Sequence, residues 1–260
     1  MFHVICFCLS TISLIFNELL YRPIFNGLVF LYNIIPGHDL GVAIIVLTVL
    51  IRLALYPLFQ KGIKSQKELA VLQPKIKELQ KKYKNEKEKQ ARALMDLYKE
   101  HGVNPMSGCL PMLIQLPILW AFFRVLITGL GDSAKLSLLY GFVSNPGTLN
   151  TISIHLFDLT KPNYILAFLA GATQFVQGKM LAPKSSPAGG KDDFASAMNK
   201  QMIYMMPVII FLAALKMPAG LPLYWTALNI FGIIQQYLMI RKQESGTKNQ
   251  ELKKNTLKNG

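Results

Sequence analysis

A single arginine, Arg52, interrupts an apolar run at residues 41–59 that contains no other charged residue. A helix needs roughly 20 apolar residues to cross a bilayer, and this run approaches that length. The guanidinium cannot lose its proton, and at a helix centre it costs roughly 2.5–3.5 kcal/mol on insertion scales. The chain must therefore bury the run and turn Arg52 toward a bundle interior or a wet cavity.

Five stretches of the chain combine the length and the apolarity of transmembrane helices. They occupy residues 41–60, 109–130, 164–182, 201–217 and 221–240. The composition agrees, since 52% hydrophobic residues and a mean hydropathy of +0.32 exceed the level of most soluble proteins. Pro218, Gly220 and Pro222 predict a tight turn between the last two stretches. We therefore predict an all-α polytopic membrane protein with a five-helix transmembrane core.

Basic residues concentrate in alternate connections between these stretches. Residues 61–107 carry twelve Lys and Arg against six Asp and Glu, and the tail from residue 241 carries six against two. Residues 131–161 are balanced, with two of each. Because Lys and Arg accumulate in cytoplasmic loops, this pattern predicts which connections face the cytoplasm. The loops at 61–108 and 183–200 and the tail at 241–260 are expected there, and the loop at 131–163 is expected outside.

The loop at 61–108 has the periodicity of two amphipathic helices. Apolar residues recur at three- and four-residue steps on both sides of a charged break at residues 84–87. They are Leu69, Leu72, Ile76, Leu79 and Tyr83, then Ala91, Leu94, Met95 and Tyr98. This spacing predicts a cytoplasmic helical hairpin, in which Pro74 either kinks the first helix or marks its start. A solvated spacer and a docking arm both remain open as its role.

The N-terminal part of the chain is less regular. Residues 19–40 are apolar but carry Arg22, Pro23 and Asn26, so we expect an interfacial amphipathic helix on the outer side. Residues 1–18 are apolar but short. A sixth crossing, a signal-like segment that is removed and a simple extension all remain open for them.

The polar residues within the five stretches limit the chemistry. None of these stretches contains Asp, Glu or His, which argues against a proton-coupled pump. Amides do occur at depths comparable to that of Arg52: Gln115, Gln174, Gln177, Asn229, Gln235 and Gln236. Several amides facing Arg52 would line a hydrophilic groove, whereas single amides more often bond a neighbouring helix, at about 0.6 kcal/mol each. Tyr224 and Trp225 lie near an outer end, where aromatic belts are expected.

Cofactor chemistry has no signal in this sequence. The cysteines Cys6, Cys8 and Cys109 lack the paired spacing and the nearby histidines of zinc sites, so we interpret them as neutral packing residues. No Gly-rich loop followed by Lys and Ser or Thr is present to hold a phosphate. We expect no cofactor, no metal and no enzymatic reaction.

Several motifs together resemble the YidC-type membrane protein insertases of the Oxa/Alb superfamily. The longest runs from His101 to Ile118 and reads HGVNPMSGCLPMLIQLPI. The others are RLALYP at 52–57, LQPKI at 72–76, QGKM at 177–180 and GLPLYW at 220–225, which Asn229 and the Gln235–Gln236 pair follow. The resemblance covers roughly residues 19–241.

This resemblance implies a groove that is open to the cytoplasm and to lipid and closed to the outside. The family arginine matches Arg52, and family groove positions match Gln177 and Trp225; Gln115 and Asn229 complete the groove that we expect. The resemblance also implies that nascent membrane proteins, membrane lipids and the ribosome are partners, with the Sec translocon as a further candidate. The hairpin and the basic tail would contact the ribosome, without specific nucleic-acid binding.

We hypothesise that the chain moves short hydrophilic tails of client proteins across the membrane and releases their apolar segments into lipid. A small-solute channel or transporter is the alternative, and a membrane-anchored ribosome or nucleic-acid tether is a third. We expect a bacterial cytoplasmic membrane, several crossings and a cytoplasmic C-terminus, because no transit-like segment begins the sequence.

Overall fold

The structure, a computed structural model, describes residues 13–104, 107, 110–129, 137–154, 156–181 and 201–256. Within these ranges it is mostly helical, as the sequence predicts. The predictions for residues 1–12, for the loop at 183–200 and for the three cysteines lie outside the described residues.

The helices follow one another through short connections, except for one long loop. They are η1 (Asn17–Tyr21), α2 (Arg22–Ile34), α3 (Leu40–Ala54), α4 (Tyr56–Lys82), α5 (Lys87–Glu100), α6 (Leu110–Arg124), η3 (Val125–Gly129), α7 (Tyr164–Leu181), η5 (Gln201–Met205), α9 (Met206–Ala214) and α10 (Gly220–Thr256). In the loop before α7, β1 (Ile152–Ser153) pairs antiparallel with β2 (Phe157–Asp158).

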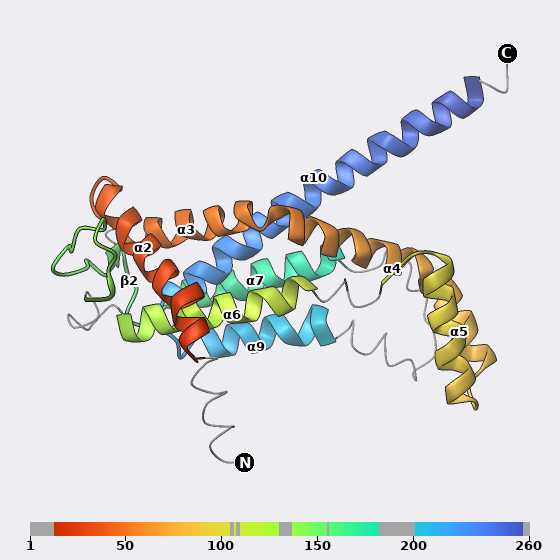
Figure 1. The fold of residues 1–260 in the computed structure, drawn as a ribbon, viewed down its shortest axis with the longest axis horizontal. Coiled ribbons are helices and arrows are strands. Elements are labelled where there is room, and N and C mark those ends of the chain that lie inside the picture. The colour runs from red at the N-terminus through yellow and green to blue at the C-terminus, as the bar shows by residue number, and fades with distance from the viewer. Residues whose placement is uncertain are drawn as a thin grey trace.

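Helices α3, α6, α7, α9 and α10 lie alongside one another as a bundle, and each overlaps one of the five apolar stretches (Figure 1). Helices α3, α7 and α10 begin at the end that carries the long loop, while α6 and α9 return toward it. Helix α10 packs against both α3 and α7, and α2 crosses the loop end of the bundle. The main core lies between α2, α3, α6 and α10, where Phe25, Leu28 and Phe122 have no exposed surface.

Length and apolarity single out few described helices as able to cross a bilayer alone. Ser13–Ile34 meets both criteria, although the sequence predicts an interfacial helix over most of it. Helices α3 and α4 meet them only as a pair that is bent by 69°. The apolar segments Met112–Ile127 and Ile203–Ala214 are shorter. The five crossings and the interfacial helix therefore stay predictions.

The bend between α3 and α4 follows from Pro57. Proline lacks the amide hydrogen that a helix interior requires, and its ring clashes with the carbonyl four residues earlier. Leu55 accordingly leaves the helical conformation, with ψ at 4°, and Pro57 lies in the first turn of α4. The chain turns at this point and leaves the bundle (Figure 1).

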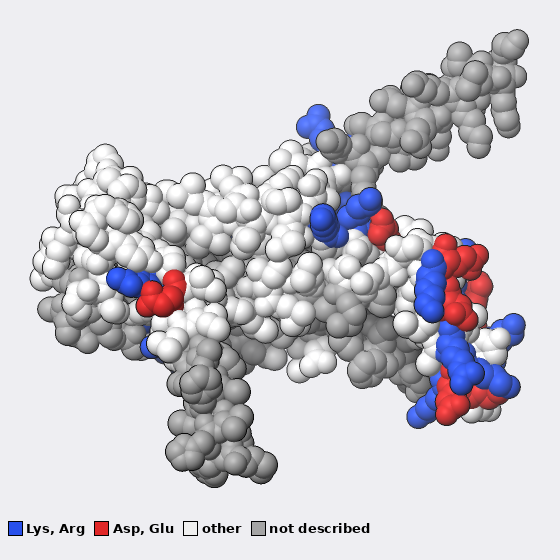
Figure 2. Space-filling view, in the orientation of Figure 1, with Lys and Arg blue, Asp and Glu red and all other residues white. Residues whose placement is uncertain are grey.

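Helices α4 and α5 form the helical pair that the periodicity predicts. Leu72, Ile76, Leu97 and Val103 are buried between them. Pro74 lies inside α4, which continues through it, and so does not mark the start of the helix. Charged side chains crowd over this pair, whereas the face of the bundle shown in Figure 2 carries few. The cytoplasmic position of the pair stays a prediction.

The long loop is fastened to the bundle by side chains of α2 and of the turn before α3. Asn26 accepts a hydrogen bond from the backbone N–H of Tyr140 at 2.6 Å and donates one to the carbonyl of Leu138 at 3.2 Å. Asp39 caps α3 through the N–H of Val42 at 3.0 Å. It also accepts from the Ser153 hydroxyl at 2.7 Å and from the Ile154 N–H at 2.6 Å. The same carboxylate therefore starts α3 and holds the strand pair.

The environment of Asp39 has a consequence for its ionisation. Partial burial acts to raise the pKa of Asp39, but the hydrogen bonds donated by Ile154, Ser153 and Val42 outweigh it and lower the pKa below its ordinary value. A carboxyl group with a lowered folded-state pKa stabilises the fold above its unfolded-state pKa, and this stabilisation is lost as the pH falls through the folded-state value.

We predict that Asp39→Ala lowers the free energy of unfolding by about 1–2 kcal/mol, because the helix cap and both loop contacts are lost. Thermal unfolding in detergent at neutral pH measures the loss. Between about pH 4 and lower values, the wild type should lose more stability than the variant, since only the wild type has this carboxylate to protonate. Parallel loss in the two proteins would contradict the assignment.

Candidate functional site

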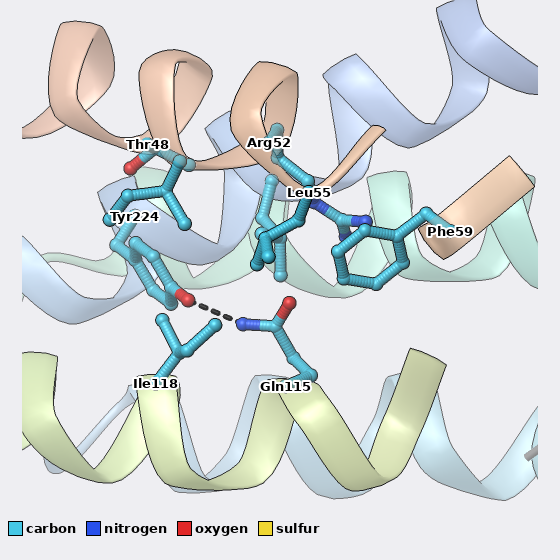
Figure 3. A pocket seen from close by; sticks show the side chains of 9 residues that line it. Thr48, Arg52, Leu55, Phe59, Gln115, Ile118 and Tyr224 are labelled. Atoms are coloured by element: carbon cyan, nitrogen blue, oxygen red, sulfur yellow. Dashed lines mark hydrogen bonds between the residues drawn. The ribbon is translucent and has the colours of Figure 1, made fainter. Parts of the chain in front are cut away.

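Arg52 lies in the last turn of α3, and only 8% of its surface is exposed. Its guanidinium carbon is 4.2 Å from the ring centroid of Phe59, within the range of a cation–π contact. Phe59 belongs to α4, so the bend after Leu55 brings this ring beside the arginine (Figure 3). The break that Pro57 causes therefore shapes the surroundings of the buried charge.

Arg52 is part of the lining of a cavity between four helices. The cavity measures about 210 Å³, counting the space at its mouth. It is lined by Thr48, Ile51, Arg52 and Leu55 of the α3 end, Phe59 of α4, Gln115 and Ile118 of α6, and Tyr224 and Leu228 of α10. Most of these side chains are apolar, so the few polar groups determine what the cavity can bind.

The charge of Arg52 is not balanced by a carboxylate in this cavity, because no lining residue is Asp or Glu. Its Nε is buried and has no hydrogen-bond partner among the described residues. A buried cation in this situation retains a strong tendency to attract water or an anion, since a neighbouring ring offers far less than hydration does. The site is suited to hold water or an acidic group next to α3.

Gln115 and Tyr224 provide the other polar groups that face the cavity. Gln115 donates from Nε2 to the hydroxyl oxygen of Tyr224 at 2.5 Å, and its own side-chain oxygen points into the cavity (Figure 3). Tyr224 is 1% exposed and stacks on Phe122 with ring centroids 4.2 Å apart. The Thr48 hydroxyl donates to the carbonyl of Ile44 instead, within its own helix. A fixed amide–hydroxyl pair thus faces Arg52 across the cavity.

The structure brings together two of the five residues that the sequence predicts for a groove, Arg52 and Gln115. Asn229 lies elsewhere, where its Nδ2 donates to Thr173 Oγ1 at 3.2 Å and to the carbonyl of Ala170 at 3.4 Å on α7. This is the bond to a neighbouring helix that was the alternative role for a single amide.

The two remaining predicted residues also do not line the cavity. Gln177 of α7 lies against Gly232 of α10, where a larger residue would strike its amide. Trp225 is half-buried against the main core. A groove that includes Gln177, Asn229 and Trp225 therefore stays a prediction, with the α7–α10 contact as the location of the first two.

Sequence reasoning missed two lining residues, Phe59 and Tyr224. Tyr224 was expected in an aromatic belt, but the structure buries it in the core. Its position four residues before Leu228, on the same face of α10, was an available signal. Phe59 carried no such signal, because its place depends on the bend. Among the described residues, no cluster of His, Cys, Asp or Glu is suited to hold a metal ion.

Comparisons with known proteins give a consistent result. The model of the family described as 60Kd inner membrane protein matches residues 30–247. A Fusobacterium nucleatum protein named membrane protein insertase YidC is 36% identical over 225 residues, which cover 86% of this chain and 98% of that protein. A Geobacter sulfurreducens protein of the same name is 34% identical, over 88% of this chain and 39% of its own length.

A solved structure is also similar. It is described as an active YidC insertase crystal structure with the first transmembrane domain resolved. The TM-score is 0.54 at 29% sequence identity, and the match covers 84% of this chain and 46% of that one. The chain thus spans nearly all of the Fusobacterium protein but less than half of the Geobacter protein and of the solved chain.

We predict that Tyr224→Phe lowers the free energy of unfolding by about 1 kcal/mol, because it leaves the Gln115 amide without its acceptor. Thermal unfolding in detergent measures the effect. Combined with Gln115→Leu, the total cost should be smaller than the sum of the two single changes, since both remove the same bond. Strict additivity would show that the bond contributes nothing.

Proposed function

Because the chain belongs to the 60 kDa inner membrane protein family, we propose that it is a membrane protein insertase, as its similar relatives are named. The family name and the bacterial relatives agree with a bacterial inner membrane as its location. Within that membrane, α3, α6, α7, α9 and α10 form the transmembrane core and α4 and α5 form a cytoplasmic hairpin. The C-terminal end of α10 then also lies in the cytoplasm.

The observation that carries this proposal is the burial of Arg52 without an acidic partner in its cavity. Moving a hydrophilic tail through a bilayer is opposed mainly by the loss of water around its charged and peptide groups. A hydrated cavity that reaches partway into the membrane shortens the dry part of this path. Arg52 keeps the cavity hydrated and attracts acidic residues of the tail, and the membrane potential assists their outward movement.

The attraction between Arg52 and a client has to stay moderate. A fully buried ion pair would hold the client in place, because separating it leaves an unpaired charge on each side. The ring of Phe59 and the nearby Gln115–Tyr224 pair provide partial compensation that a client group can replace without a large penalty. The client then leaves laterally, because its apolar segment is more stable in lipid.

The groove that we propose extends beyond the cavity to Gln177, Asn229 and Trp225. Its clients are nascent membrane proteins, and lipids contact the outer faces of the bundle. The basic hairpin and the basic tail from Arg241 onward bind the ribosome, for which a cluster of positive charge is suited. Action together with the Sec translocon, rather than alone, is part of the same proposal.

A small-solute channel or transporter explains the observations less well. Coupled transport of ions or protons requires acidic or titratable groups within the membrane, and the described parts of the five core helices contain no Asp, Glu or His before residue 241. A ribosome tether explains the basic hairpin and tail but gives no role to a buried arginine.

We predict that Arg52→Ala slows insertion of a single-span client with a short acidic tail into proteoliposomes by about tenfold, which corresponds to about 1.4 kcal/mol. The physical reason is the loss of the charge that hydrates the cavity and attracts the tail. Arg52→Lys retains the charge and should retain most of the activity. Protease protection of the tail measures insertion. Normal insertion by the alanine variant would refute a requirement for charge.

We also predict that deletion of residues 67–100, which make up most of the helical pair α4–α5, abolishes insertion while the protein still resides in the membrane. The deletion removes the arm that is proposed to receive the client and the ribosome, but it leaves Arg52 and Phe59 in place. Membrane fractionation is the control for residence. A solute channel would keep its conductance after this deletion, so retained conductance with no insertion by the intact protein favours that alternative.

A further inference from the structure

Two adjacent amides on α10 are buried and incompletely bonded. Gln235 and Gln236 are each 3% exposed. In the part of the chain that the structure describes, Nε2 of Gln235 and Oε1 of Gln236 have no hydrogen-bond partner. Buried polar atoms in folded proteins are nearly always paired, so each exception calls for an explanation.

Other polar side chains of the same helix do have partners. The Thr226 hydroxyl donates to the carbonyl of Pro222 at 2.8 Å, within α10. The Asn229 amide donates to Thr173 and Ala170 of α7. Helix α10 therefore pairs its polar groups where it contacts α7 near its start, and leaves them unpaired one to two turns later, at Gln235 and Gln236.

Gln235 lies on the face of α10 that lines the Arg52 cavity. It follows Leu228 by seven residues and Tyr224 by eleven, which are spacings of a single helical face. It also lies at about the depth of Arg52. Gly41 at the start of α3 packs against Leu223, and twelve residues, or roughly 18 Å, lead from there to Leu53 and to Gln235 along helices that run in the same direction.

Gln236 faces the neighbouring side, toward α7. It follows Gly232 by four residues, and Gly232 packs against Gln177 of α7. The two glutamines thus bridge the cavity between α3 and α10 and the contact between α10 and α7. Side by side, they offer an unpaired donor and an unpaired acceptor, which are the groups that complement one peptide unit.

We propose that Gln235 and Gln236 form an amide subsite that binds the peptide backbone of the client segment beside the Arg52 cavity. This proposal rests on the proposed insertase function and adds a substrate feature to it. Every client has peptide groups that lose water on entering the membrane, whatever its side chains are. A pair of amides compensates this loss without regard to sequence, whereas Arg52 favours acidic side chains.

The test uses Gln235→Met and Gln236→Met in the full-length protein, because methionine keeps the length of glutamine without its hydrogen-bonding groups. Two clients are inserted into proteoliposomes, one with an acidic tail and one in which each Asp of the tail is Asn. Each variant should slow both clients to the same extent, by roughly threefold. Arg52→Ala should slow the acidic client far more than the neutral one.

Stability separates a binding role from a structural one. Removal of an unpaired buried polar group should leave the unfolding temperature in detergent unchanged or raise it. Thr226→Val, which removes a buried hydroxyl that is bonded within its own helix, is the matched control and should insert both clients at the wild-type rate. A clear drop in unfolding temperature, or failure to fold, in the methionine variants would show that the amides are structural and would overturn the proposal.

The insertion assay gives two further outcomes that can be told apart. Wild-type rates with both clients in the methionine variants would overturn the amide subsite, while a slow Arg52→Ala protein would still support the insertase function. Failure of the wild-type protein to insert either client would refute the insertase function itself and the subsite with it.

Discussion

A buried guanidinium that faces an aromatic ring instead of a carboxylate determines much of this structure. Arg52 lies where α3 ends, Phe59 covers it from α4, and the Gln115–Tyr224 pair faces it from α6 and α10. Four helices therefore converge on one charge that none of them neutralises within the cavity. Such an arrangement costs stability in a bilayer, so its value has to lie in what the unneutralised charge can attract.

The two ends of α3 fix the position of this charge by different means. At the start, Asp39 caps the helix and at the same time binds the strand pair of the long loop. At the end, Pro57 forces the bend that supplies Phe59. The loop end of the bundle is thus closed by hydrogen bonds, whereas the other end opens into the charged pair of α4 and α5 (Figures 1 and 2).

The helices and the importance of Arg52 were predictable from the sequence, because apolar length and a lone charge are local signals. The helical pair α4–α5 was predictable for the same reason, from its periodicity. The set of residues around Arg52 was only partly predictable. Gln115 was expected, but Phe59 is placed by a bend of 69°, and Tyr224 by its face on α10 rather than by its closeness to a predicted membrane surface. Asn229 shows that an amide at the right depth can bond a neighbouring helix instead.

The continuity of α4 has a mechanical consequence. Phe59 lies about 6 Å along the helix from Leu55, whereas Lys82 at the far end lies about 40 Å away. If α4 tilts as a rigid rod about Leu55, the tip travels roughly seven times as far as the ring. A large swing of the charged arm thus becomes a small, finely graded shift of the aromatic cover over the arginine, as in a reduction lever.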